Sequence, residues 1–207
     1  MDATNLLKNV EIVPVVVIDD PKSALPLAET LIQAGFSTIE VTLRTPHALV
    51  AIENSAKAFP DACIGAGSVR SALQFAQARD AGARFAVSPG ASDSLLDAAA
   101  KHNLPFVPGA VTASEIIRLQ DCGYSLIKFF PAELAGGVNM LKAIGAPLPE
   151  ARFFPTGGIS PDLAPEYLKL PNVACLGGSW IAPVGLVSAR DFKSISKLAK
   201  NARLLVT

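Results

Sequence analysis

The sequence predicts an α/β fold in which one domain, residues 1–207, forms a (β/α)₈ barrel of the TIM-barrel type. Eight short runs of β-branched and aromatic residues alternate with helical stretches along the chain. This alternation predicts right-handed βαβ units and a parallel sheet. Eight units of about 25 residues each lie near the short end of the range for such barrels. No low-complexity linker or long run of charge divides the sequence, so we expect a single domain.

The expected strands are short, apolar and bounded by turn residues, which is typical of strands that are covered on both faces. They cover residues 12–18, 37–43, 62–67, 84–88, 104–109, 125–130, 152–158 and 173–179. The helical period falls between them, at Ser23–Ala34, Pro46–Ala58, Ser71–Ala81, Ser92–Lys101 and Thr112–Cys122. Gly35, Gly82 and Gly123 each stand where a helix C-cap is expected. The stretch Gly136–Glu150 is the least regular, and we expect only a short helix there.

A doubly wound open sheet is the alternative architecture for a chain that alternates strands and helices. The count of eight strands favours the barrel, as does the absence of a G-x-G-x-x-G loop after the first strand. In a barrel, the active site lies at the carboxyl ends of the strands. The polar residues at those ends are therefore the candidates for a site.

The composition favours a small-molecule partner. Eighteen basic residues balance 18 acidic ones, so no overall field attracts nucleic acid or an anionic membrane surface. No apolar run approaches the roughly 20 residues of a membrane helix. The first residues lack the basic and apolar regions of a signal peptide, so we expect a cytoplasmic protein. Three distant cysteines fit no metal spacing, and we expect reduced, small hydrophobic side chains.

Lys128 stands inside an apolar strand, Leu126–Phe130. Period-two alternation puts Leu126, Lys128 and Phe130 on one face of this strand. Burial disfavours an ammonium ion, and the neutral amine is the form that attacks a ketone. A lysine whose end reaches solvent or pairs with a carboxylate remains the alternative interpretation.

Glu40 interrupts another expected strand and shares its face with Thr42 and Arg44. A carboxyl group in an apolar barrel is suited to general acid/base chemistry. Arg44, nearer the strand end, has the geometry to bind a carboxylate with two hydrogen bonds. An internal Glu40–Arg44 ion pair without a chemical role is equally compatible with the pattern.

Two glycine pairs end the last two expected strands, in Thr156-Gly157-Gly158 and Gly177-Gly178-Ser179. The loops after strands seven and eight of barrels often bind phosphate through backbone N–H groups. Glycine allows close approach, and the hydroxyl groups of Thr156 and Ser179 add possible contacts. Ordinary tight turns are the alternative. The two histidines, His47 and His102, have no neighbouring metal-ligand pattern, so we expect surface positions and no metal.

Seven motifs along the chain resemble those of one enzyme family, the 2-keto-3-deoxy-6-phosphogluconate (KDPG) aldolases, which include the 4-hydroxy-2-oxoglutarate (KHG) aldolases. The resemblance covers nearly the whole chain, and its motifs are specific and occur in the family's order. They are IEVTLRT (39–45), GAGSV (65–69), FAVSPG (85–90), VPGAVT (107–112), IKFFPAE (127–133), FPTGGIS (154–160) and LGGSW (176–180).

This resemblance implies a metal-independent class I aldolase without a cofactor, acting in the Entner–Doudoroff pathway as a homotrimer. It implies a Schiff-base lysine at Lys128, a general acid/base at Glu40 and a carboxylate ligand at Arg44. Pro89 and Phe130 match pocket positions, and the family's phosphate loops match Gly157, Gly158, Gly178 and Ser179. The expected reaction cleaves the phosphogluconate acid to pyruvate and glyceraldehyde 3-phosphate, and 4-hydroxy-2-oxoglutarate is a second expected substrate.

Ser68 departs from the family pattern, which more often has threonine at this position. The hydroxyl group that would lie near the substrate carboxylate is kept, so we expect a modest change in fit. Two other functions remain open. A phosphosugar epimerase or isomerase would fit the glycine loops but would leave the lysine unexplained. A phosphate-ligand binding protein would show saturable binding without turnover or a covalent adduct.

Overall fold

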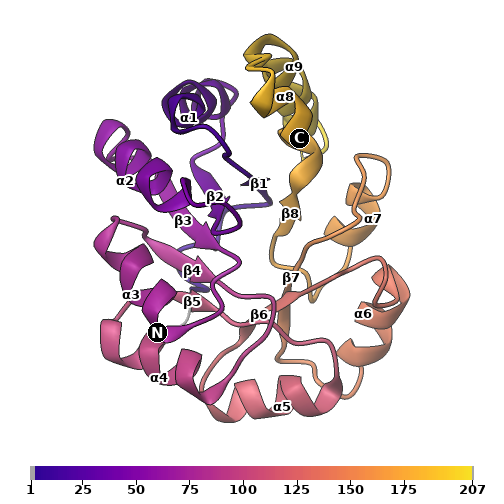
Figure 1. The fold of residues 1–207 in the computed structure, drawn as a ribbon. Helices are drawn as coiled ribbons and strands as arrows, with labels where there is room; N and C mark the ends of the chain where they lie inside the picture. The colour runs from indigo at the N-terminus through magenta and orange to yellow at the C-terminus, as the bar shows by residue number, and fades with distance from the viewer. Residues whose placement is uncertain (1–2, 207) are drawn as a thin grey trace.

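The computed structural model describes residues 3–206 and confirms the barrel predicted from the sequence (Figure 1). Strands surround the centre, and helices form the outer layer. The strands are β1 (Ile12–Val16), β2 (Thr38–Thr42), β3 (Cys63–Gly67), β4 (Phe85–Val87), β5 (Phe106–Val107), β6 (Leu126–Phe129), β7 (Arg152–Pro155) and β8 (Leu176–Gly178). Within residues 3–206, no helix has the length and apolar character needed to span a membrane.

The strands pair in parallel and in chain order, with β8 returning to β1. Ladders join β5-β4-β3-β2-β1-β8 and, separately, β6-β7. Parallel bridges between Gly109 and Lys128 and between Thr156 and Gly177 join the two groups. The N–H group of Lys128 donates to the carbonyl of Pro108 at 2.8 Å, which ties β6 to the end of β5. This closed ring is the barrel and excludes the open doubly wound sheet.

Some strands are shorter than expected, and β5 is the clearest case. The apolar pattern predicts a strand over 104–109, but only Phe106 and Val107 are paired as a strand. Pro105 and Pro108 flank them, and proline has no N–H group to donate to a ladder. Their carbonyl groups still accept hydrogen bonds from the neighbouring strands.

Two apolar layers follow from the alternation of side chains along each strand. Ile127 and Phe129 belong to the large layer between strands and helices. Leu126 belongs to the smaller layer inside the ring, with Val13, Phe85, Val107, Phe154 and Cys175. Lys128 has the parity of Leu126, so its side chain starts inside the barrel, as expected from the period of two.

In several cases the expected sequence signals mark the ends of the outer helices. These helices are α1 (Ala24–Gln33), α2 (Ala48–Ala58), α3 (Ala72–Asp80), α4 (Asp93–His102), α5 (Ala113–Asp121), α6 (Gly137–Gly145), α7 (Ala164–Leu168), α8 (Val184–Ser188) and α9 (Phe192–Arg203), with short 3₁₀ turns η1 (Pro21–Ser23) and η2 (Ser179–Ile181). The predicted C-cap residues Gly35, Gly82 and Gly123 all have positive φ. The last helices, α8 and α9, are not among the elements expected from the sequence; α9 packs beside α1.

Candidate active site

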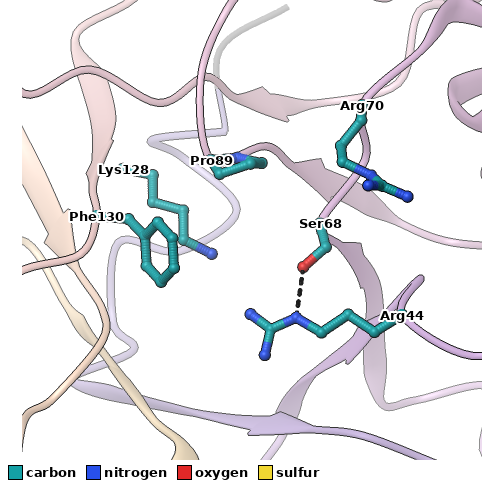
Figure 2. A pocket seen from close by; sticks show the side chains of 6 residues that line it. All are labelled: Arg44, Ser68, Arg70, Pro89, Lys128 and Phe130. Carbon is teal, nitrogen blue, oxygen red and sulfur yellow. Dashed lines mark hydrogen bonds between the residues drawn. The ribbon is translucent and has the colours of Figure 1, made fainter.

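A cavity of about 440 Å³ opens at the carboxyl ends of the strands. Its lining residues come from the loops or ends of β2, β3, β4 and β6: Arg44, Ser68, Arg70, Pro89, Lys128 and Phe130 (Figure 2). Five of these are candidates predicted from the sequence. The barrel thus brings together residues that are up to 86 positions apart along the chain (Arg44 to Phe130).

Lys128 and Glu40 form a buried pair below this cavity. The lysine Nζ atom lies 3.3 Å from Oε1 of Glu40, and the two side chains are 2% and 0% exposed. The second carboxylate oxygen, Oε2, is buried and has no hydrogen-bond partner among the described residues. One oxygen therefore holds the amine, while the other is free to exchange a proton with a third group. The internal ion pair between Glu40 and Arg44 is not observed; the partner of Glu40 is Lys128.

Glycine at position 67 makes room for the Glu40 carboxyl group. Gly67 ends β3 and is paired in register with Thr42 on β2. A β-carbon added at Gly67 would overlap the side chain of Glu40, at 2.7 Å from both Cγ and Cδ. Such distances are too short for any side chain to coexist with the carboxylate in its present position. The absence of a side chain at Gly67 thus allows the Glu40 carboxyl group to lie beside Lys128.

Arg44 and Ser68 are joined by a hydrogen bond across the cavity wall. The Nε–H group of Arg44 donates to Oγ of Ser68 at 3.1 Å (Figure 2). Ser68 has a φ of 55°, in the left-handed region that few residues other than glycine adopt. This hydrogen bond uses only the Nε atom of Arg44. The two terminal nitrogens of its guanidinium form no ion pair with a carboxylate among residues 3–206. A carboxylate of a ligand would complete this arrangement.

Phe130 and Pro89 form the apolar walls around the lysine. The Lys128 Nζ atom lies 5.5 Å from the centre of the Phe130 ring. Pro89, at the end of β4, packs closely against Gly109, where no β-carbon would fit. The ring and the proline limit access of water to the amine of the lysine, whose side chain is 2% exposed.

A second cavity of about 350 Å³ adjoins the first, because Arg44 and Phe130 line both. Thr156, Gly157 and Ser179 line this second cavity together with Val15 and Val17, at the end of β1, and residues 182–184, at the start of α8. The Thr156 hydroxyl is buried and has no partner among the described residues. A polar ligand group at this point would satisfy it.

Two predicted phosphate-loop glycines do not line either cavity. A β-carbon added at Gly158 would meet the side chain of Glu133, and one added at Gly178 would meet the side chains of Trp180 and Ile181. Both Gly157 and Gly158 have positive φ, at 102° and 81°. A contribution of Gly158 or Gly178 through the backbone alone therefore stays a prediction.

Arg70 lines the cavity and was not predicted from the sequence. Its side chain is exposed on the wall beyond Ser68 (Figure 2). Its backbone N–H donates to Oε1 of Gln74 at 2.8 Å, which fixes the start of the loop. The available signal was its place two residues after Ser68, directly after a strand end where barrel sites occur.

Neither cavity is lined by a histidine or a cysteine among the described residues. His47 is exposed, and His102 is half-buried and pairs with Arg79 through Nδ1 at 2.6 Å. Cys63 and Cys175 are buried and free, whereas Cys122 is free and exposed. Burial, and in second place the charge of Glu40, raise the pKa of the Cys175 thiol. Among residues 3–206, no three His, Cys, Asp or Glu side chains are grouped to hold a metal ion.

Residues 3–198 match the family model for KDPG and KHG aldolase. The 2-dehydro-3-deoxy-phosphogluconate aldolase of Pseudoalteromonas atlantica is 53% identical over 191 residues, which are 92% of this chain and 89% of that protein. The KHG/KDPG aldolase of Escherichia coli strain K12 is 44% identical over 200 residues, 97% of this chain and 94% of that protein.

Solved structures agree. The KDPG aldolase of Legionella pneumophila, with pyruvate captured as a covalent carbinolamine intermediate, has a TM-score of 0.94 and 44% identity over 98% of both chains. The enzyme of Zymomonas mobilis ZM4 with 3-phosphoglycerate has a TM-score of 0.91 and 41% identity, over 97% of this chain and 94% of that one. The barrel and these relatives define the chain as an aldehyde-lyase. It belongs to the family of KDPG and KHG aldolases, as its motifs predict.

Proposed function

We propose that this chain is a class I aldolase that cleaves 2-dehydro-3-deoxy-6-phosphogluconate to pyruvate and glyceraldehyde 3-phosphate through an imine on Lys128. The observation that carries the proposal is the buried amine of Lys128, 3.3 Å from the Glu40 carboxyl group in a cavity walled by Arg44. A structural relative captured with pyruvate as a covalent carbinolamine supports it. No metal or cofactor enters this chemistry.

The reaction begins with attack of the neutral Lys128 amine on the C2 carbonyl of the substrate. Loss of water from the carbinolamine gives a protonated imine, which accepts the electron pair of the C3–C4 bond. Glu40 removes the proton of the C4 hydroxyl as that bond breaks, so the aldehyde leaves and an enamine remains. Protonation at C3 and hydrolysis of the imine then release pyruvate and restore the amine.

The two ends of the substrate bind in the two adjoining cavities. Arg44 and Ser68 hold the keto-acid carboxylate, beside Pro89 and Phe130. The phosphate lies against Thr156, Gly157 and Ser179, with Gly158 and Gly178 contributing backbone groups. A relative solved with 3-phosphoglycerate supports an anionic three-carbon ligand in this fold. Anchoring both ends keeps C2 to C4 beside Lys128 and Glu40.

4-Hydroxy-2-oxoglutarate is the second proposed substrate, cleaved to pyruvate and glyoxylate. It carries a carboxylate where the first substrate carries its phosphate end, and a relative 44% identical to this chain is a KHG/KDPG aldolase. We also propose a cytoplasmic, single-domain enzyme of the Entner–Doudoroff pathway that assembles as a homotrimer. Analytical ultracentrifugation tests the trimer by giving three times the mass of one chain.

Reductive trapping tests the imine directly. Pyruvate and borohydride should leave one reduced adduct on the peptide that contains Lys128, and Lys128→Met should abolish both adduct and cleavage in a folded protein. Lys101→Met, at an exposed helical position, is the matched control and should keep both. Absence of an adduct on the folded wild type would refute the imine, and would favour a phosphosugar isomerase or a binding protein.

A further inference from the structure

Glu133 and Tyr167 form a polar contact next to the glycine loop that the proposed chemistry does not use. Tyr167, on α7, is fully buried, and its hydroxyl donates a hydrogen bond to Oε1 of Glu133. Burial, and then this hydrogen bond, raise the pKa of the tyrosine hydroxyl. The hydroxyl group is therefore protonated, and able to donate, near neutral pH.

The backbone around Glu133 is paired with the glycine loop. The N–H group of Ala132 donates to the carbonyl of Thr156 at 2.9 Å, and that of Glu133 donates to the carbonyl of Gly157 at 3.1 Å. The loop after β6 thus runs beside the loop after β7. Residues 132 and 133 are therefore hydrogen-bonded directly to Thr156 and Gly157, which both line the second cavity.

The side chain of Glu133 fills space that two glycines leave. A β-carbon on Gly158 would lie 2.8 Å from Cβ of Glu133, and one on Gly137 would lie 3.2 Å from both the Glu133 Oε1 and the Tyr167 hydroxyl. The contact is therefore enclosed by the loop on one side and by the start of α6 on the other. Gly158 itself has a φ of 81°. A glycine without such contacts would adopt other φ values about as readily.

We infer that Glu133 and Tyr167 are positioning residues that hold the Thr156–Gly158 loop in the conformation that receives the anionic end of the substrate. Backbone N–H groups bind an anion well only when their directions are fixed beforehand. Gly157 and Gly158 have no side chains that would restrict their backbone conformation. The two backbone hydrogen bonds and the Tyr167–Glu133 contact restrict it instead. The inference rests on the proposed function, because it assumes that an anion binds at this loop.

The test separates the two ends of the substrate. Tyr167→Phe removes only the donor, and Glu133→Ala removes the acceptor and the stem that covers Gly158. Each should raise the KM for the phosphorylated substrate about tenfold, the size expected for losing a hydrogen bond to a charged group. The kcat and the pyruvate concentration that half-saturates borohydride trapping should stay within about twofold of wild type. Glu133→Gln keeps an oxygen that accepts from Tyr167 and should restore the KM.

Tyr124→Phe is the matched control, since Tyr124 is also buried but packs against Phe106 at the far end of β6. It should leave the KM unchanged. Unchanged KM values in Tyr167→Phe and Glu133→Ala would overturn the inference. So would a parallel loss of pyruvate trapping, which would indicate a general role in folding. Wild-type cleavage is measured first: no cleavage by wild type refutes the proposed function, whereas cleavage with insensitive variants refutes only the positioning role.

Discussion

The Nζ atom of Lys128 lies 3.3 Å from Oε1 of Glu40, and neither side chain is more than 2% exposed. Separating two ionisable groups that are buried this deeply would cost free energy, because each charge would then have no partner in an apolar barrel. Their burial keeps the pair out of contact with bulk water. In the proposed reaction, Oε2, which has no hydrogen-bond partner among residues 3–206, is the atom available to exchange protons with the substrate.

Replacing Glu40 by Gln should lower the kcat of cleavage by about 10²–10⁴, the usual contribution of a general acid/base group. The amide keeps the size of the side chain but cannot accept a proton from the C4 hydroxyl. Pyruvate trapping on Lys128 should persist, more slowly. Steady-state cleavage and time-resolved trapping measure the two effects, and a kcat within threefold of wild type would make Glu40 a structural residue.

A methyl group at position 67 should lower activity by displacing the Glu40 carboxyl group, although Gly67 itself takes no part in the chemistry. In Gly67→Ala the new β-carbon overlaps the Glu40 carboxyl group, which must move away from Lys128. We expect kcat to fall at least tenfold and stability to fall by about 1–3 kcal/mol, as for other overpacked sites. Cleavage assays and denaturant unfolding measure both.

Gly90→Ala is the control for Gly67→Ala, because a methyl group at position 90 would meet no atom within 4 Å and Gly90 has no positive φ. It should leave activity and stability near wild type. Full activity in Gly67→Ala would show that Glu40 works equally well from another position, which contradicts the geometry proposed for the pair.

Removing the Ser68 hydroxyl should weaken binding of the keto acid. In Ser68→Ala the Nε–H group of Arg44 loses its acceptor, and the guanidinium is no longer held against the wall. Because Arg44 is exposed, we expect the loss to be about 1 kcal/mol, or a five- to tenfold higher KM with little change in kcat. Initial rates at varied substrate concentration measure it.

Ser71→Ala is the comparison for that loop, since the Ser71 hydroxyl caps α3 by accepting from the N–H of Gln74 at 3.2 Å. It should cost about 1 kcal/mol of stability and leave the KM unchanged. A KM that rises equally in both variants would mean that the loop conformation, and not the Ser68 hydroxyl, sets affinity.

The barrel and most of the site follow from local patterns in the sequence. Alternation placed Lys128 inside the ring, and the strand ends identified Arg44, Ser68 and Thr156. The pairing of Lys128 with Glu40 does not follow from any local pattern, because it depends on how β2 and β6 face each other across the ring, 88 residues apart. The pattern left Arg44 as an equal candidate for the partner of Glu40, and only the closed barrel decides between them.

The roles of two glycines also could not be predicted from the sequence. Gly67 belongs to the GAGSV motif, but the sequence does not indicate that its missing side chain makes room for the carboxylate of a neighbouring strand. The same is true of Gly158 and Glu133. A sequence pattern describes what a residue does along its own chain, whereas these functions depend on the element beside it.

Arg70 should act at a distance from the chemistry, as an exposed positive charge on the cavity wall that attracts an anionic substrate. In Arg70→Gln we expect kcat/KM to fall about threefold at low ionic strength, with kcat unchanged. The difference should shrink above about 0.3 M salt, where the screening length falls to about 6 Å. Arg84→Gln makes the same change of charge at an exposed position before β4, at the opposite end of the barrel, and should have little effect at any salt concentration. A salt-independent rise in KM for Arg70→Gln would instead indicate direct contact with the bound substrate. Equal effects of the two variants would contradict any special role of Arg70, because net charge alone would then account for the change.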